Sequence, residues 1–225
     1  MSERGLELVE ERTVHVAAGR QALEGDLSVP AHARGVVLFA HGSGSSRFSA
    51  RNKHVAAVLQ EHGFATLLLD LLTPNEEQLD QLSGEYRFDI GRLAERLIGA
   101  AAWLAAEDST AGLALSIFGA STGGGAALVA AAELPERVAA VVSRGGRPDL
   151  AGDALERVVA PTLLIVGGND EVVLELNRAA LAKLRATARL EVIPGATHLF
   201  EEPGTLDEVA RHAVAWFDSY ASRAR

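Results

Sequence analysis

Five short runs of mainly apolar residues restrict the folds open to this chain more than any other feature. Each run is about the length of one strand, and its near-continuous apolar character is typical of strands that are covered on both faces. Most of the stretches between the runs carry apolar residues at helical spacing. Strands that alternate with helices predict an α/β fold with a mostly parallel sheet and helices on both faces. The five predicted strands are residues 35–40, 64–69, 113–118, 138–142 and 161–166.

The remaining segments fit the same architecture. Strands at 6–16 and 21–29 predict an N-terminal antiparallel hairpin, with a turn at Gly19–Arg20 and a stop at Pro30. We also expect a last strand at 190–193 and a final helix that opens with a capping box from Thr205 to Glu208. Further helical stripes cover residues 55–62, 90–104, 126–132 and 174–184.

Residues 71–87 follow neither period. They leave the strand at 64–69 on the side where parallel strands end, so we expect them to form one wall of a pocket. The sequence has no repeat and no linker, and its 225 residues fall within the roughly 200–250 that such folds often use as one domain. We therefore expect a single domain over residues 1–225, without a large cap domain.

The segment Gly119-Ala120-Ser121-Thr122-Gly123 carries the strongest functional signal. It fits Gly-x-Ser-x-Gly between a predicted strand and a predicted helix, which is the setting of a nucleophile elbow. A turn this tight strains the serine backbone, and the flanking glycines let the strand and helix approach each other. The serine hydroxyl would stand beside free N–H groups at the start of the helix. We therefore interpret Ser121 as a nucleophile, although a structural turn has the same composition.

Two further polar residues follow the carboxyl ends of predicted strands. Asp170 comes after the strand at 161–166, and His198 lies in the loop after 190–193. The order Ser121, Asp170, His198 is that of the α/β-hydrolase triad. His198 would accept the serine proton, and Asp170 would orient the imidazole. Taken singly, Asp170 could instead cap a helix and His198 could be a solvated loop residue.

The loop His41-Gly42-Ser43-Gly44 follows the strand at 35–40. This is where such folds place the second oxyanion donor, so the N–H of Gly42 or Ser43 would pair with that of Thr122. A plain glycine turn is the alternative. Arg144 and Arg147 follow the strand at 138–142 and could bind an anionic substrate group through paired N–H donors, unless they form salt bridges with Asp149 or Asp153.

Composition excludes several classes of function. A net charge of −9 argues against nucleic-acid binding and against anionic membrane surfaces. The absence of cysteine excludes disulfides, thiolate metal sites and a cysteine nucleophile. No apolar stretch approaches the roughly 20 residues of a membrane span, and residues 1–11 lack the apolar segment of a secretory signal. We expect a cytoplasmic protein without metal or cofactor; the remaining histidines, without metal-ligand spacing, are His15, His32, His54, His62 and His212.

These motifs together resemble the α/β-hydrolase superfamily, and within it the small, single-domain group similar to dienelactone hydrolases. The resemblance rests on residues 41–44, 119–124, 164–170 and 195–198 and so extends over most of the chain. Dienelactone hydrolases use a cysteine, which this chain lacks, so their activity is not carried over. The stretches 51–52 and 143–149 resemble a branch that is sometimes joined to phosphoribosyltransferase domains; it implies the fold and the triad but no substrate.

The sequence thus predicts a serine hydrolase that cleaves small carboxylic esters through an acyl-enzyme intermediate. Thioesters or activated amides would use the same machinery. The alternative is a catalytically silent α/β-hydrolase-fold binding module or a partner of another enzyme, because a fold does not fix a function. We expect a monomer or homodimer that acts on a small molecule.

Overall fold

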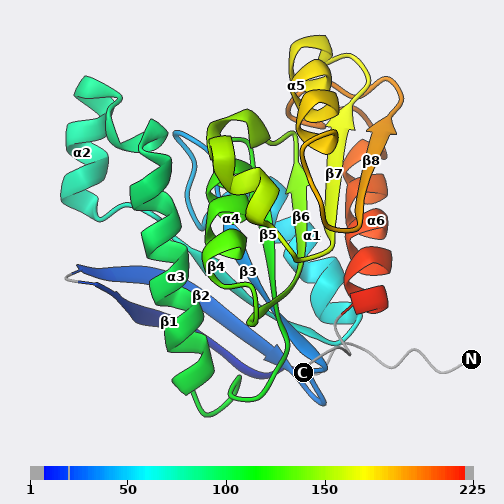
Figure 1. Ribbon diagram of the computed structural model, residues 1–225. Coiled ribbons are helices and arrows are strands. Elements are labelled where there is room, and N and C mark those ends of the chain that lie inside the picture. Colours follow the sequence, from blue (N-terminus) through cyan, green and yellow to red (C-terminus); the bar gives the residue numbers. More distant parts are fainter. Residues whose placement is uncertain (1–7, 20, 221–225) are drawn as a thin grey trace, which may run out of the picture.

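The computed structural model describes residues 8–19 and 21–220, and one sheet of eight strands forms its centre (Figure 1). The strand order is β1-β2-β4-β3-β5-β6-β7-β8. The N-terminal hairpin of β1 (Leu8–Ala18) and β2 (Gln21–Pro30) joins the sheet by antiparallel pairing of β2 with β4. All other neighbours pair in parallel. These strands are β3 (Gly35–Ala40), β4 (Phe64–Leu69), β5 (Leu115–Ala120), β6 (Val138–Arg144), β7 (Thr162–Gly167) and β8 (Ala188–Ile193).

The predicted α/β class, with its mostly parallel sheet and antiparallel N-terminal hairpin, is therefore confirmed. The strand predicted at 113–118 is shifted by two residues, because β5 runs from Leu115 to Ala120. Leu6 and Arg20, which belong to the predicted hairpin, lie outside the described residues. No helix in the part of the chain that the structure describes is long and apolar enough to cross a membrane.

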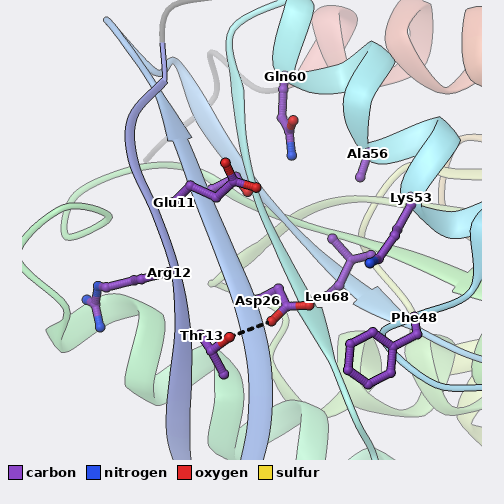
Figure 2. Close-up of a pocket in the computed structure, with 10 residues that line it drawn as sticks. Glu11, Arg12, Thr13, Asp26, Phe48, Lys53, Ala56, Gln60 and Leu68 are labelled. Atoms are coloured by element: carbon purple, nitrogen blue, oxygen red, sulfur yellow. Dashed lines mark hydrogen bonds between the residues drawn. The ribbon is translucent and has the colours of Figure 1, made fainter.

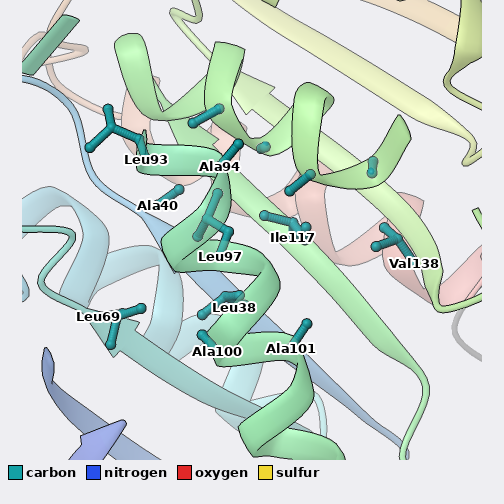
Figure 3. Close-up of a cluster of buried hydrophobic side chains, with 14 of the residues drawn as sticks. Leu38, Ala40, Leu69, Leu93, Ala94, Leu97, Ala100, Ala101, Ile117 and Val138 are labelled. Carbon is teal, nitrogen blue, oxygen red and sulfur yellow. The ribbon is translucent and has the colours of Figure 1, made fainter. Parts of the chain in front are cut away.

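Helices cover both faces of the sheet. One face carries α1 (Ala50–Glu61) and α6 (Thr205–Tyr220), and the other carries α3 (Ile90–Ala106), α4 (Thr122–Glu133) and the 3-10 segment η2 (Pro148–Arg157). Successive strand residues point to opposite faces. Leu38 and Ile117 therefore pack under α3 and α4 (Figure 3), while the rings of Phe39 and Phe118 meet on the α1 face with centroids 5.0 Å apart. Burial of each leucine side chain in these layers contributes about 1.5–3 kcal/mol.

Residues 71–87, for which no regular structure was predicted, contain the helix α2 (Pro74–Ser83) and the short 3-10 turn η1 (Tyr86–Phe88). Thr73 caps α2, and Glu76 completes the capping box by accepting a hydrogen bond from the Thr73 N–H at 2.8 Å. The helix escaped prediction because its buried residues are the carboxylates Glu76 and Asp80, while Leu79 and Leu82 are exposed. Figure 1 shows α2 and α5 (Glu171–Leu181) at the same end of the sheet, and the role of α2 as a wall of the substrate pocket stays a prediction.

The capping box predicted at the start of α6 is wrong. Thr205 is the first helical residue, and its hydroxyl donates to the Glu202 carbonyl at 2.8 Å. The N–H of Glu208 donates instead to the Gly204 carbonyl at 3.1 Å, and the Glu208 carboxylate pairs with Arg211. The predicted box required Thr205 to be the N-cap residue, but Thr205 is already the first residue of the helix.

Candidate active site

Ser121 lies between the last residue of β5 and the first residue of α4, and its backbone is strained as the elbow motif predicts. Its φ of 51° and ψ of −122° put a residue with a Cβ in a region that costs about 1–3 kcal/mol. The flanking glycines permit close approach, since a Cβ on Gly119 would lie 2.6 Å from the Gly123 carbonyl oxygen. A Cβ on Gly123 would overlap the carbonyl oxygen of Ala40 on β3. The turn therefore holds Ser121 at the carboxyl edge of the sheet.

Asp170 and His198 meet at the same edge. Asp170 follows β7 and directly precedes α5, while His198 lies in the loop between β8 and α6. The imidazole Nδ1 of His198 and the carboxylate Oδ2 of Asp170 are 2.6 Å apart. Because an ionised carboxylate only accepts, Nδ1 carries the hydrogen and Nε2 is left free to accept a proton. The Asp170 side chain is 15% exposed and that of His198 39%, so the pair is open to a ligand on one side.

Hydrogen bonds fix the two loops that carry this pair. Asn169 binds the other loop through its N–H to the Ala196 carbonyl and through its side-chain amide to the Gly195 carbonyl, both at 2.9 Å. Glu202 braces the residue before the histidine, accepting from the Thr197 N–H at 3.1 Å and from its hydroxyl at 2.6 Å. The orientation of His198 is therefore set by backbone geometry as well as by its partner carboxylate.

The segment 144–147 connects Ser121 to His198. The Ser121 N–H donates to the Arg144 carbonyl at 3.2 Å, and its own carbonyl accepts from the Arg147 N–H at 3.0 Å. Gly145 lies against the imidazole, since a Cβ there would be 3.5 Å from Nδ1 of His198. Both side chains thus border one short loop, although the hydroxyl of Ser121 forms no hydrogen bond with the ring. Such catalytic contacts often tighten only when a substrate binds.

The expected oxyanion residues also lie beside the elbow. A Cβ on Gly42 would be 2.9 Å from the Ser121 Cβ, and the hydroxyls of Ser43 and Thr122 are 3.1 Å apart. Thr122 is the first residue of α4, so its N–H has no partner within that helix. The loop 41–44 and the start of α4 therefore meet around the serine.

His41 is a structural contributor that the sequence analysis did not single out. Its Nε2 accepts from the Leu71 N–H at 3.0 Å, which places the hydrogen on Nδ1, and Nδ1 donates to the Gly42 carbonyl at 2.9 Å. Burial lowers the pKa of His41, so the ring is uncharged at neutral pH. The Gly42 carbonyl also accepts from the Ser45 N–H at 3.2 Å. The sequence feature that could have pointed to His41 is its position directly after a buried strand.

The two arginines behave differently. Arg147 forms a bidentate pair with Asp149, at 2.8 and 2.7 Å, which is the salt-bridge alternative, and its binding of a substrate stays a prediction. Arg144 is buried, with its guanidinium carbon 5.9 Å from the centre of the Phe200 ring. Its side chain forms no ion pair within the described residues.

Two hollows lie away from the Asp170–His198 pair. One of about 330 Å³ separates the loop 41–47 from the start of α2, and its lining includes His41, Asp70 and Pro74. Another of about 550 Å³ lies between the hairpin and α1 and includes Thr13, whose hydroxyl is hydrogen-bonded to Asp26 (Figure 2). None of the predicted site residues lines this second hollow, so its size does not indicate the site of chemistry.

The other histidines lie at the surface or on helices, as expected. Among the described residues, no group of three or more His, Cys, Asp or Glu side chains could hold a metal ion. The five are His15 on β1, His32 in the turn after β2, His54 and His62 at α1, and His212 on α6.

Known proteins resemble this chain over most of its length. A Mycobacterium tuberculosis protein, present in two strains and provisionally named a phosphoribosyl transferase, is 61% identical over 204 residues. That match covers 91% of this chain but only 45% of the relative, so the chain spans about half the length of the curated proteins it matches. The crystal structure of a dienelactone hydrolase from Anabaena variabilis is 58% identical, covers 94% of this chain and 98% of that one, and superposes with a TM-score of 0.92.

A more distant structure, a Xanthomonas campestris α/β serine hydrolase without a lid, has a TM-score of 0.71 at 21% identity, over 93% of this chain and 98% of that one. At that identity the likeness shows the fold alone. The family profile of the dienelactone hydrolases matches residues 23–221. Since the profile and the Anabaena structure agree, the chain belongs to the dienelactone hydrolase family, a family of α/β hydrolases.

Proposed function

We propose that this hydrolase cleaves small carboxylic esters by a serine mechanism, with Ser121, His198 and Asp170 as its catalytic triad. The observation that supports the proposal most strongly is the 2.6 Å hydrogen bond between Asp170 and His198 beside the strained elbow of Ser121. An isolated histidine or aspartate in a loop would need no such arrangement. Membership of the dienelactone hydrolase family supports the same class of reaction.

The geometry suits acyl transfer. Ser121 Oγ attacks the ester carbonyl carbon while its proton passes to Nε2 of His198, and Asp170 stabilises the imidazolium that forms. The same proton then goes to the departing alkoxide, which leaves an acyl-serine and a free alcohol. A water molecule then attacks the acyl carbon and gives a proton to His198, which passes it to Ser121 Oγ as the acyl–serine bond breaks and the acid is released. Thioesters would follow the same steps with a thiolate as leaving group.

The oxyanion would be held by the N–H groups of Thr122 and Ser43. The Gly42 carbonyl is engaged by His41 and Ser45, and no peptide bond among the described residues is cis. In a trans peptide the N–H points opposite to the carbonyl, so the Ser43 N–H faces away from His41. The Ser43 side chain also reaches Thr122. These contacts favour Ser43 over Gly42 as the second donor; each such donor is worth about 10²–10³ in kcat.

A fluorophosphonate tests the whole assembly without knowledge of the natural substrate. It reacts with a serine only when a base accepts the proton and an oxyanion hole receives the charge. We expect one label per chain on Ser121, none in Ser121→Ala and strongly slowed labelling in His198→Ala. Slow labelling scattered over several hydroxyl groups would favour the silent binding module instead.

Substitution of the orienting carboxylate tests the proposed base. Asp170→Asn keeps the shape of the side chain but favours the wrong imidazole tautomer, so kcat should fall by about 10⁴ while the fold is retained. Circular dichroism and thermal unfolding would serve as the fold control. Full activity in this variant would contradict the assignment of Asp170, and Glu171 would be the next residue to substitute.

The length of acyl chain that the site accepts should depend on how deeply the neighbouring segments enclose it. The segment around α2 is the candidate wall, and we propose a shallow site that favours short acyl chains. Turnover of nitrophenyl esters that rose steadily from acetyl to long chains would contradict this. Phosphoribosyl transfer is not proposed, because the relative with that name is covered over only 45% of its length and the matched part belongs to a hydrolase family.

A further inference from the structure

Asn177 is a polar side chain on a face of α5 that is otherwise apolar and buried. The residue is fully buried, and its side-chain Nδ2 donates to the Gly146 carbonyl at 3.0 Å and to the carbonyl of Val173, one turn earlier in the helix, at 2.8 Å. Both partners can only accept, so both amide hydrogens are in use. The other buried residues of α5 are Val173, Leu174 and Ala180.

An amide at this position costs stability. The Oδ1 atom of Asn177 is buried and has no hydrogen-bond partner in the part of the chain that the structure describes. A buried polar atom without a partner costs about 1–3 kcal/mol, which an apolar side chain of the same shape would not. What the amide provides in return is a bond to a loop of the candidate site.

Gly146 belongs to the segment 144–147, which lies between the proposed nucleophile and the proposed base. The first and last residues of the segment form backbone hydrogen bonds with Ser121 at 3.2 and 3.0 Å. The neighbouring Gly145 packs against the imidazole of His198, where a Cβ would lie 3.5 Å from Nδ1. A shift of the Gly146 peptide would therefore be felt at both side chains.

The Gly146 peptide is enclosed by two helices. A Cβ on Gly124 of α4 would lie 3.0 Å from the Gly146 Cα, and α5 supplies the Asn177 amide. Asp170 directly precedes α5, seven residues or about 10 Å of helix before Asn177. One rigid helix therefore carries the carboxylate that orients His198 at its start and binds the loop of Ser121 two turns later.

We propose that Asn177 is a positioning residue of this hydrolase, which fixes the segment 144–147 through Gly146 and so sets the geometry between Ser121 and His198. The inference rests on the proposed function and adds a residue that touches neither the substrate nor the reacting atoms. Misplacement of reacting groups by about 1 Å lowers a rate by about 10²-fold. The simpler alternative is that Asn177 only anchors α5 and contributes nothing to the reaction.

The first experiment removes the donor and keeps the branched shape of the side chain. In Asn177→Leu, kcat for p-nitrophenyl acetate should fall about 10- to 100-fold while KM changes little, because the contacts to substrate are intact. The rate at which fluorophosphonate labels Ser121 should fall in parallel, since labelling uses the same attack. A purely anchoring role would lower the melting temperature and leave both rates unchanged.

Thr110→Val is the matched control. Thr110 is also buried, and its hydroxyl donates to the Leu104 carbonyl at 2.7 Å. It precedes β5, so it lies at the end of the sheet opposite to Ser121, which follows that strand. Loss of this donor should lower the melting temperature but leave turnover and labelling as in wild type. An equal fall of kcat in both variants would reduce the effect to general destabilisation and overturn the inference.

A second variant tests the bond to Gly146 by pH. In Asn177→Asp the neutral carboxyl group can still donate one hydrogen bond, whereas the ionised form only accepts and repels the two carbonyls. The labelling rate of this variant, divided by that of wild type at the same pH, should therefore decrease as pH rises and the new carboxyl group ionises. Division by wild type removes the titration of His198. Circular dichroism at each pH confirms that the variant is folded, and a flat ratio would contradict the positioning role.

The inference and the proposed function can fail separately. If wild type is labelled on Ser121 and Asn177→Leu matches its kcat and labelling rate, the positioning role is overturned and the serine mechanism stands. If wild type itself is not labelled, the serine mechanism fails and the role of Asn177 fails with it. If Asn177→Leu does not fold, the pH series of Asn177→Asp decides, with a falling ratio in favour and a flat one against.

Discussion

Helices α2 and α3 follow each other in the sequence, yet opposite chemistry holds them in place. α3 buries a stripe of apolar side chains that includes Leu93, Leu97 and Leu104. α2 buries the carboxylates Glu76 and Asp80 and leaves Leu82 89% exposed. Glu76 binds Arg96 and Arg92 of α3 at 2.8 and 3.2 Å, and Asp80 binds Arg87 at 2.6 Å. A helix next to the candidate site is therefore attached by charge, and its neighbour by hydrophobic burial.

The largest expected effect is on the apolar helix. Leu97 is fully buried between α3 and the sheet, so Leu97→Ala should reduce the free energy of unfolding by about 2–5 kcal/mol through lost burial and the cavity left behind. Urea unfolding followed by circular dichroism measures this. A loss well below 1 kcal/mol would show that α3 is not part of the cooperative core.

Removal of an ion pair that holds α2 should reduce stability less than Leu97→Ala does, and the effect should be confined to the region around α2. In Glu76→Gln the Arg96 guanidinium, whose side chain is 9% exposed, loses its charged partner and keeps the Ala18 carbonyl. Local opening of residues 74–83 should become easier by about 1–3 kcal/mol, as measured by amide hydrogen exchange. Glu95→Gln, an exposed carboxylate on α3, is the matched control. Equal effects of the two substitutions would mean that the ion pair does not anchor α2.

Acid should detach α2 before it unfolds the core. Burial raises the pKa values of Glu76 and Asp80, but hydrogen bonds and the neighbouring arginines outweigh it, so both pKa values are lowered overall. Groups with a lowered folded-state pKa stabilise the fold above their unfolded pKa, and this contribution is lost as pH falls through the folded value. Protection of residues 74–83 should therefore decrease below about pH 4 while that of β5 persists. Simultaneous loss in both segments would contradict the difference between the helices.

The smallest effect is expected at the exposed leucine. Leu82→Ala should change the free energy of unfolding by no more than about 0.5 kcal/mol, because its side chain already contacts water in the folded state. It is the matched counterpart of Leu97→Ala. A loss of several kcal/mol would mean that another chain covers Leu82 in solution.

The same contrast explains what the sequence could predict. The strands of the parallel sheet were found because near-continuous apolar runs report burial directly, and the elbow was found because few residue types tolerate that turn. α2 was missed because its buried side chains are carboxylates while its leucines face solvent. A search for apolar residues at helical spacing cannot find a helix of this kind. The partners of Arg144 and Arg147 could not be distinguished either. Both follow the same strand, and only the fold shows that Asp149 reaches one and not the other.

The site was predictable to a similar extent. Ser121, Asp170 and His198 were selected by their positions after strand ends. The structure brings Asp170 and His198 into contact and places the segment 144–147 between Ser121 and His198, while their role as a catalytic triad stays a prediction. The role of His41 could be recognised only in the folded structure, because the Leu71 N–H that donates to its ring lies 30 residues away in the sequence. Long-range backbone contacts of this kind leave no pattern in the sequence.

The backbone of Ser121 has a consequence for the history of the chain. At a φ of 51°, glycine would relieve the strain that serine carries there, so replacement by glycine is the change that selection for stability alone would favour. A lineage that no longer needed the hydroxyl would be expected to lose it early. The serine therefore stands at this position at a cost in stability, which its proposed role as the nucleophile would explain.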